Sequence, residues 1–189
     1  MKLKLYFVLK IDSNLRKVSL SVGIGEYLIA SMPSSLSTWA LGSCISVILY
    51  DPFKKVGALS HCMLPEPLSS SESDNKYVSI ALPNMVHDLE RLGINRLNLH
   101  AAVIGGANIF GFSGKFDIGR RNVSKAIEIL NEYKIPIDIL DVGGNKGRNV
   151  AFLLSTGEIF VSYTTRNVFR RNLYGRALNY RSTTPQENL

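Results

Sequence analysis

The sequence predicts an α+β domain, with mixed and antiparallel β-sheets in a layered α/β sandwich and a few flanking helices. Short β-branched apolar runs bounded by turn residues outnumber the amphipathic helical patterns by about three to one. Helices and hairpins are interspersed, whereas a doubly wound parallel sheet would alternate strand and helix regularly. With 189 residues, 46% of them apolar and 20% charged, the chain can bury one core without disulfides or a structural metal.

A β-hairpin is the clearest element in the first half of the chain. Residues 45–50 and 56–64 are apolar runs, and the turn-forming stretch 51–55 separates them. The second run ends at Pro65, because proline cannot donate a hydrogen bond to a sheet. Upstream of the hairpin, the Ser- and Pro-rich stretch 31–37 is interpreted as a loop, and a strand is expected to follow it.

The second half of the chain contains two helical patterns among strands. In residues 76–92 the apolar positions recur every three or four residues, which predicts an amphipathic helix that ends at Gly93. The same spacing predicts a second helix over 122–133. The other elements are a glycine-rich loop at 105–119, strands at 97–104 and 135–142, and a closing hairpin at 150–154 and 158–162.

The positive charge of the chain is concentrated at its two ends. Of the net charge of +7, residues 1–20 and 163–189 contribute +4 each, whereas residues 21–162 carry −1. We therefore expect a basic N-terminal extension, a central domain and a basic C-terminal tail with these boundaries. Apolar residues at helical spacing make the tail a candidate amphipathic docking helix. A near-neutral body does not fit a nucleic-acid-binding domain, which would carry a basic face.

The chain is interpreted as cytoplasmic. No stretch approaches the roughly 20 apolar residues of a membrane-spanning helix, so direct membrane insertion is not expected. Residues 1–9 combine lysines with a short apolar run, but no small-residue cleavage site follows closely, as it would in a signal peptide. The two cysteines, Cys44 and Cys62, are therefore expected to be reduced thiols.

Cys44 and His61 are the candidate pair for nucleophilic catalysis. A cysteine hydrolase needs a thiol and a histidine that moves its proton. Cys44 precedes the first strand of the predicted hairpin and His61 lies near the end of the second, and such positions meet in an antiparallel pair. Cys62 would point to the opposite face and serve as a core residue. On this pattern alone, a purely structural role for Cys44 and His61 stays open.

Glycines near Cys44 indicate where an oxyanion could be bound. Gly42 and Ser43 form a turn whose backbone N–H groups can face a developing negative charge. Gly105 and Gly106, in the glycine-rich loop, are further candidates for this substrate and oxyanion loop. The sequence contains no CxxC, HExxH or GxxxxGK[ST] pattern. We therefore predict no metal ion and no cofactor.

Ordered motifs extend over about residues 23–161. They are TWALGSCISV at 38–47 followed by Tyr50-Asp51, GALSHCMLP at 57–65, GGANIF at 105–110, IGRRN at 118–122, and DVGG at 141–144 with Gly147-Arg148. In this order they resemble the chemoreceptor glutamine deamidases known as the CheD family. The resemblance implies an enzyme that hydrolyses glutamine side-chain amides of methyl-accepting chemotaxis receptors to glutamate and releases ammonia.

The resemblance also implies roles for three residues. Cys44 would attack the amide and form a thioester, and His61 would move protons. Thr38, at the family's third position, would accept a hydrogen bond from the imidazole and fix its tautomer. Receptors would be the protein substrates, and family members also pair with the chemotaxis phosphatase CheC, which makes a CheC-type phosphatase a candidate partner.

Two other functions stay open at this point. A chain of this family could keep the fold as a regulatory binding module for a CheC-type phosphatase, without turnover. A cysteine amidase or peptidase that acts on unrelated substrates would need the same Cys44 and His61. Assays on receptor fragments, with a Cys44 variant as control, separate these functions from receptor deamidation.

Overall fold

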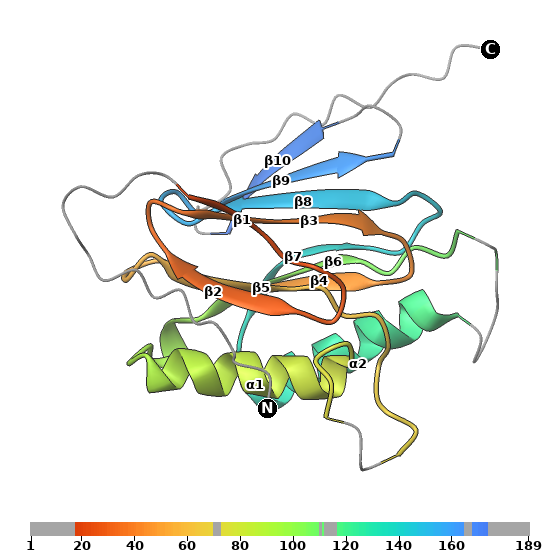
Figure 1. Cartoon of the computed structure of the whole chain (residues 1–189), viewed down its shortest axis with the longest axis horizontal. Helices are drawn as coiled ribbons and strands as arrows, with labels where there is room; N and C mark the ends of the chain where they lie inside the picture. The colour runs from red at the N-terminus through yellow and green to blue at the C-terminus, as the bar shows by residue number, and fades with distance from the viewer. Residues whose placement is uncertain (1–17, 70–72, 110, 112–116, 165–167, 174–189) are drawn as a thin grey trace.

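Two β-sheets and a pair of helices are stacked in three layers (Figure 1). The structure, a computed structural model, describes residues 18–69, 73–109, 111, 117–164 and 168–173. In strand order, the outer sheet consists of β1 (Ser19–Ser21), β3 (Ser35–Leu41), β8 (Arg148–Leu153), β9 (Glu158–Tyr163) and β10 (Val168–Asn172). The central sheet consists of β2 (Tyr27–Ser31), β5 (Val56–Ser60), β4 (Ile45–Asp51), β6 (His100–Gly105) and β7 (Ile137–Val142). The helices are α1 (Val78–Arg91) and α2 (Ile118–Glu132).

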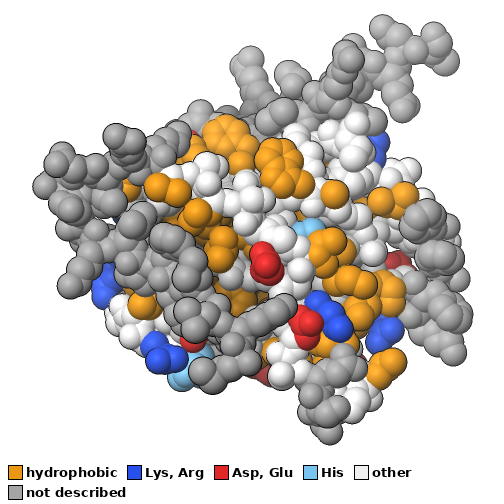
Figure 2. Space-filling model, viewed as in Figure 1, with side chains coloured by type: hydrophobic (Ala, Val, Ile, Leu, Met, Phe, Trp, Pro, Cys, Tyr) orange, Lys and Arg blue, Asp and Glu red, His pale blue; other side chains and the backbone are white. Residues whose placement is uncertain are grey.

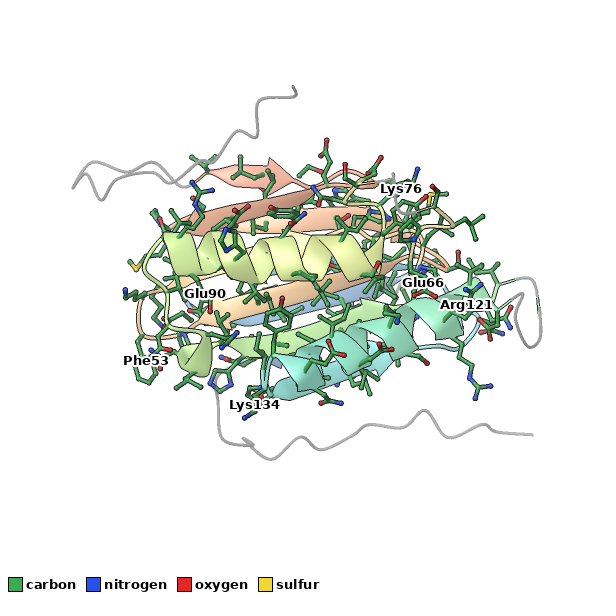
Figure 3. All side chains as sticks on the ribbon, turned by 90° about the horizontal axis from the view of Figure 1, so that it is seen from below. Phe53, Glu66, Lys76, Glu90, Arg121 and Lys134 are labelled. Carbon is green, nitrogen blue, oxygen red and sulfur yellow. The ribbon has the colours of Figure 1, made fainter. Side chains whose placement is uncertain are left out.

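The central sheet is covered on both faces, by the outer sheet and by the helices (Figures 1 and 3). All seven residues of β4 are buried, and a continuous apolar run is typical of such a strand. Ile45 and Val47 point into the core under the helices, whereas Ile48 and Tyr50 point into the core between the sheets. The alternation of β4 therefore separates the two cores.

The predicted α+β sandwich is confirmed. Most neighbouring strands are antiparallel, while the parallel pairs β1–β3 and β6–β7 make both sheets mixed. The predicted hairpin is β4–β5, and Asp51 Oδ1 accepts hydrogen bonds from the N–H groups of Phe53 and Lys54 in its turn. No helix among the described residues is long and apolar enough to cross a membrane.

Both predicted helices are present, and the largest shift of a boundary is at the start of α2. Helix α1 continues through Pro83 and ends at Arg91. Helix α2 begins at Ile118, four residues before the predicted start, because the side chain of Asp117 caps it and accepts a hydrogen bond from the N–H of Arg120.

The prediction of a loop over residues 31–37 was wrong for Ser31 and for residues 35–37. The segment contains the end of β2 and the beginning of β3. Ser35 and Ser37 are buried, and they pair with β1 on one side and with β8 on the other. Partners from distant parts of the chain therefore impose the strand, against a composition that is typical of loops.

The C-terminal segment also differs from the expected helix. Val168–Asn172 form β10, which pairs antiparallel with β9 at the edge of the outer sheet. Leu173 is buried in the core between the sheets. Strand pairing satisfies backbone groups along the edge of β9, which an amphipathic helix would leave open. Residues 1–17 of the N-terminal extension and 174–189 of the tail lie outside the described residues.

Candidate active site

Thr38 and His61 come from different sheets and meet between them. Thr38 lies on β3, His61 follows β5, and both are buried. Thr38 Oγ1 lies 2.8 Å from His61 Nδ1 and 2.8 Å from the carbonyl oxygen of Val22. A hydroxyl has one proton and a carbonyl oxygen can only accept, so Thr38 donates to Val22 and His61 donates its Nδ1–H to Thr38. The imidazole is therefore the Nδ1–H tautomer.

This tautomer leaves His61 Nε2 with a lone pair that can accept a proton. Among the described residues, Nε2 is buried and has no hydrogen-bond partner. The backbone on either side of the ring is held in place as well. The N–H of His61 donates to the carbonyl of Glu26, and the N–H of Gly25 donates to the carbonyl of His61, each at 2.9 Å. The position of the His61 ring and its Nδ1–H tautomer are thus both fixed.

The register of the β4–β5 hairpin places Cys44 on the same face as His61. Ile45 pairs with Cys62 in an antiparallel bridge, which puts Ser46 opposite His61 and makes Cys44 a diagonal neighbour of His61. Cys44 is half-buried against the core between the sheets, whereas Cys62 is fully buried in the core under the helices. Cys44 is therefore the thiol placed on the side of the ring.

The glycine-rich loop after β6 holds the turn that precedes Cys44. The N–H of Gly106 donates to the carbonyl of Cys44, and the N–H of Ala107 donates to the carbonyl of Gly42, each at 2.8 Å. A Cβ atom at Gly105 would lie 2.5 Å from the Cys44 carbonyl oxygen, so this approach requires glycine. The Gly106 N–H is thus engaged with the backbone of Cys44. The N–H of Cys44 itself lies beside its own Sγ, where an oxyanion would form.

Burial favours the neutral forms of Cys44 and His61. Removal from water raises the pKa of the Cys44 thiol, and the nearby N–H of Cys44 opposes this shift without cancelling it. Removal from water also lowers the pKa of the His61 imidazole. Both shifts favour the uncharged form. These directions favour a thiol and a neutral imidazole, a pair in which transfer of a proton from Cys44 to His61 would generate the thiolate.

Exposed apolar side chains lie on the segments that carry the site. Ile24 precedes Gly25, whose N–H donates to the carbonyl of His61. Trp39 follows Thr38, Met63 follows Cys62, and the side chain of Ile109 lies over Gly42. A β-bulge after Thr38 accompanies the outward position of Trp39. This apolar rim consists of Ile24, Trp39, Met63 and Ile109, which are 62%, 58%, 42% and 49% exposed. Figure 2 shows that apolar side chains gather on one face of the molecule. Exposed apolar side chains that gather on a surface are typical of protein-binding sites.

A groove lies beside α2, next to the segment that follows His61. It is lined by Pro65, Glu66, Arg120, Arg121, Ser124, Lys125 and Glu128. Glu66 and Arg121 lie at the same end of the molecule (Figure 3). Lys125 Nζ lies 3.4 Å from a Glu66 carboxylate oxygen and 2.9 Å from one of Glu128, so the charge of Lys125 is compensated. Within the described part of the chain, no group of three His, Cys, Asp or Glu side chains could hold a metal ion.

Sequence reasoning assigned no role to one buried polar residue beside the site. Asn122 is fully buried on α2, and its Nδ2 lies 2.9 Å from the carbonyl oxygen of Ser43 and 3.0 Å from that of Met63. The signal was present in the helical spacing, because Asn122 precedes Ala126 and Leu130 by four and eight residues and shares their apolar face. A polar residue at such a position indicates a buried hydrogen-bonding role.

The family model and the curated relatives with similar sequences agree with each other. Residues 63–163 match the CheD family, described as CheD chemotactic sensory transduction. A probable chemoreceptor glutamine deamidase CheD of Clostridium kluyveri is 42% identical over 145 residues, which cover 74% of this chain and 90% of that protein. The protein of the same name from Clostridium botulinum strain Hall is 41% identical over 147 residues, covering 75% and 91%. Among solved structures, Bacillus licheniformis hypothetical protein YfiH gives a TM-score of 0.46 at 13% identity, over 64% of this chain and 51% of that one.

Proposed function

The chain belongs to the CheD family, and on this basis we propose that it hydrolyses glutamine side-chain amides of chemoreceptors, with Cys44 as the nucleophile. The observation that carries the proposal is the relay from His61 through Thr38 to the Val22 carbonyl. This relay leaves Nε2 as the only ring nitrogen able to accept a proton, on the face that also bears Cys44. The net reaction consumes one water, converts glutamine to glutamate and releases ammonia.

The first half-reaction forms a thioester. His61 Nε2 takes the thiol proton of Cys44 while Sγ attacks the carbonyl carbon of the glutamine side chain. The resulting imidazolium keeps its Nδ1–H on Thr38, which is already oriented to accept it. The oxyanion meets the backbone N–H groups of the turn at Ser43 and Cys44. When the C–N bond breaks, Nε2 returns the proton to the departing nitrogen, and ammonia leaves.

The second half-reaction hydrolyses the thioester. The neutral imidazole takes a proton from water, and the hydroxide attacks the acyl carbon. Collapse of the second tetrahedral intermediate breaks the C–S bond and yields the glutamate side chain. The sulfur of Cys44 recovers the proton from His61. The site returns to the neutral pair that burial favours.

The experiment that tests this function is mass spectrometry of a folded, unmodified receptor cytoplasmic fragment after incubation with the protein. We expect selected glutamines to gain the mass difference between an amide and an acid, with ammonia released in equal amount. Free glutamine, offered in parallel, is expected to remain unchanged, because the apolar rim favours a protein-borne side chain. A receptor fragment whose glutamines all stay amides would contradict the proposal.

The apolar rim predicts a specific binding defect. Trp39→Ala is expected to raise KM for the receptor fragment by about 10-fold or more, with little change in kcat, because a large aromatic side chain at an interface contributes strongly to binding. Phe53→Ala is the matched control, since Phe53 is 69% exposed on the β4–β5 turn and lies outside the rim. Steady-state kinetics of ammonia release separate the two parameters. Equal KM values in the two variants would remove Trp39 from substrate binding.

The pKa directions predict a broad pH plateau for kcat/KM. The acid limb reports protonation of His61, and because burial lowers that pKa, the limb is expected below 6.5, the ordinary imidazole value. The alkaline limb reports ionisation of Cys44, and because burial raises that pKa, it is expected above 9.0, the ordinary thiol value. Initial rates of ammonia release measure both limbs. An alkaline limb below 9.0 would indicate a resting thiolate–imidazolium pair instead.

A CheC-type phosphatase is the candidate partner, as members of this family pair with CheC. The alternative function, a regulatory binding module without turnover, predicts that such a phosphatase binds while the receptor fragment keeps its glutamines. Co-purification with a CheC-type phosphatase and the mass-spectrometric assay on the same preparation distinguish the two. The expected cytoplasmic location stays a prediction.

A further inference from the structure

We propose that Asn122 is a positioning residue, which sets the distance between the turn that carries Cys44 and the segment that carries His61. The proposal rests on the proposed roles of Cys44 and His61. Asn122 reaches both segments at once, through hydrogen bonds from Nδ2 to the carbonyls of Ser43 and Met63. Ser43 precedes Cys44 directly, and Met63 lies two residues after His61.

The backbone hydrogen bonds between the two segments end beside the site. Ile45 and Cys62 exchange backbone hydrogen bonds of 2.9 and 2.8 Å. In this register the next hydrogen-bonded pair would join Ser43 to Leu64. Instead, the N–H of Leu64 donates to the carbonyl of Lys76, at 3.1 Å. The strands therefore diverge where the catalytic groups are held.

Asn122 replaces the hydrogen bond that this divergence removes. The Ser43 carbonyl, which has lost its partner on the neighbouring strand, accepts from Asn122 Nδ2 at 2.9 Å. The second proton of the same NH₂ group goes to the Met63 carbonyl at 3.0 Å. One side-chain amide thus spans the gap between the two segments.

The surroundings of Asn122 determine the orientation of its amide. The side chain is fully buried, and among the described residues Oδ1 has no hydrogen-bond partner. A flipped amide would place Oδ1 against two carbonyl oxygens, which can only accept. The NH₂ group must therefore face Ser43 and Met63. The hydrogen bonds to the two carbonyls outweigh the cost of an unpaired acceptor.

Helix α2 provides a fixed base for Asn122. A Cβ atom at Gly119 would lie 2.5 Å from the Gly106 carbonyl oxygen, so the first turn of α2 packs directly on the loop after β6. The N–H of Gly106 is the group that holds the Cys44 carbonyl. The helix that positions Asn122 and the loop that supports Cys44 therefore contact each other without intervening side chains.

An ion pair between the same helix and the segment that follows His61 offers a matched control. Lys125, one turn after Asn122, pairs with Glu66 on the segment that follows His61, at 3.4 Å. This pair also joins α2 to that segment, but the Glu66 side chain is 51% exposed. Exposed ion pairs contribute little, because water screens them. Lys125→Ala therefore removes an exposed connection and leaves the buried one intact.

The first test compares kinetics on the receptor fragment. Asn122→Ala and Asn122→Asp are expected to lower kcat on the order of 100-fold with KM nearly unchanged, since a displacement of about 1 Å between reacting groups has this effect. Asn122→Asp keeps the size of the side chain but sets carboxylate oxygens against the two carbonyls. Asn122→Ser, which keeps one donor, is expected to lie between native and alanine variants. Lys125→Ala is expected to match the native protein.

The second test is independent of deamidation. The rate at which iodoacetamide alkylates Cys44 is measured against pH for the native protein, the Asn122 variants and His61→Ala. Because His61 assists ionisation of the thiol, we expect the Asn122 profiles to move toward that of His61→Ala. This readout remains valid if the native protein fails to deamidate a receptor, so a failure of the proposed function is distinguished from a failure of this inference.

Two outcomes would overturn the proposal. In one, the Asn122 variants retain native kcat and the native alkylation profile. In the other, kcat falls only in proportion to the folded fraction, measured by near-ultraviolet circular dichroism, while the folded molecules alkylate like the native protein. The second outcome would assign Asn122 a purely structural role.

Discussion

Replacing Cys44 with alanine is expected to abolish deamidation of the receptor fragment, while the protein remains folded. The thiol is the only group that forms a bond to the substrate in the proposed reaction, so its removal leaves at most the residual rate that binding and the oxyanion site supply, a loss of at least about 10⁴-fold. Folding should be little affected, because Cys44 is half-buried rather than enclosed in the core. Mass spectrometry of the fragment after incubation with each protein measures the effect.

Cys62 provides the matched control for this experiment. Cys62→Ala also removes a thiol, but Cys62 lies two residues after the end of β5 and on the opposite face of the sheet. Its side chain is fully buried under the helices. We expect a modest loss of stability, about 1 kcal/mol, and retained deamidation. Activity in the Cys44→Ala protein would exclude Cys44 as the nucleophile. Loss of activity in a folded Cys62→Ala protein would contradict the purely structural role of Cys62.

Thr38→Val is expected to lower kcat by about 10²- to 10⁴-fold. Valine has the shape of threonine but lacks the hydroxyl, so the Nδ1–H of His61 and the Val22 carbonyl both lose their partner. Without this acceptor, the proton of the neutral imidazole is no longer held on Nδ1. Part of the population then carries the proton on Nε2, which cannot accept the thiol proton. Steady-state ammonia release is the measurement.

The same substitution also affects stability. Two polar groups are left buried without a partner, which is expected to lower the free energy of unfolding by about 1–3 kcal/mol for each. Thr38→Ser restores the hydroxyl and is expected to recover most of kcat, which separates the hydrogen bond from side-chain packing. Native kcat in a folded Thr38→Val protein would show that the relay has no catalytic role.

Local sequence patterns predicted the fold where strand pairing is local. The β4–β5 hairpin is recognisable because two apolar runs flank a short turn, and its register brings Cys44 near His61. The same patterns failed for β3, whose serines are buried by pairing with strands from both ends of the described chain. They also failed for β10, where pairing with the edge of β9 decided the structure. Composition reports local preference, and these strands depend on distant partners.

The candidate site, too, was predictable from local patterns only in part. Proximity of Cys44 and His61 followed from the hairpin, whereas the role of Thr38 came only from resemblance to a family, because its strand belongs to the other sheet. Gly106 was expected near an oxyanion, and the structure shows its N–H bound to the Cys44 carbonyl. No local pattern specifies that bond, since the two residues are far apart in sequence and meet only after β6 pairs with β4.

The division of the site between two sheets also bears on when the enzyme becomes active. The β4–β5 hairpin by itself carries Cys44 and places His61 nearby, but Thr38 and Val22 join them only when the outer sheet docks. Before docking, the imidazole is free to choose either tautomer and remains in water, where it assists the thiol poorly. We therefore expect the Cys44 thiol of a newly synthesised or partly unfolded chain to be unreactive. Such a chain should not deamidate glutamines of other proteins until the sandwich is assembled.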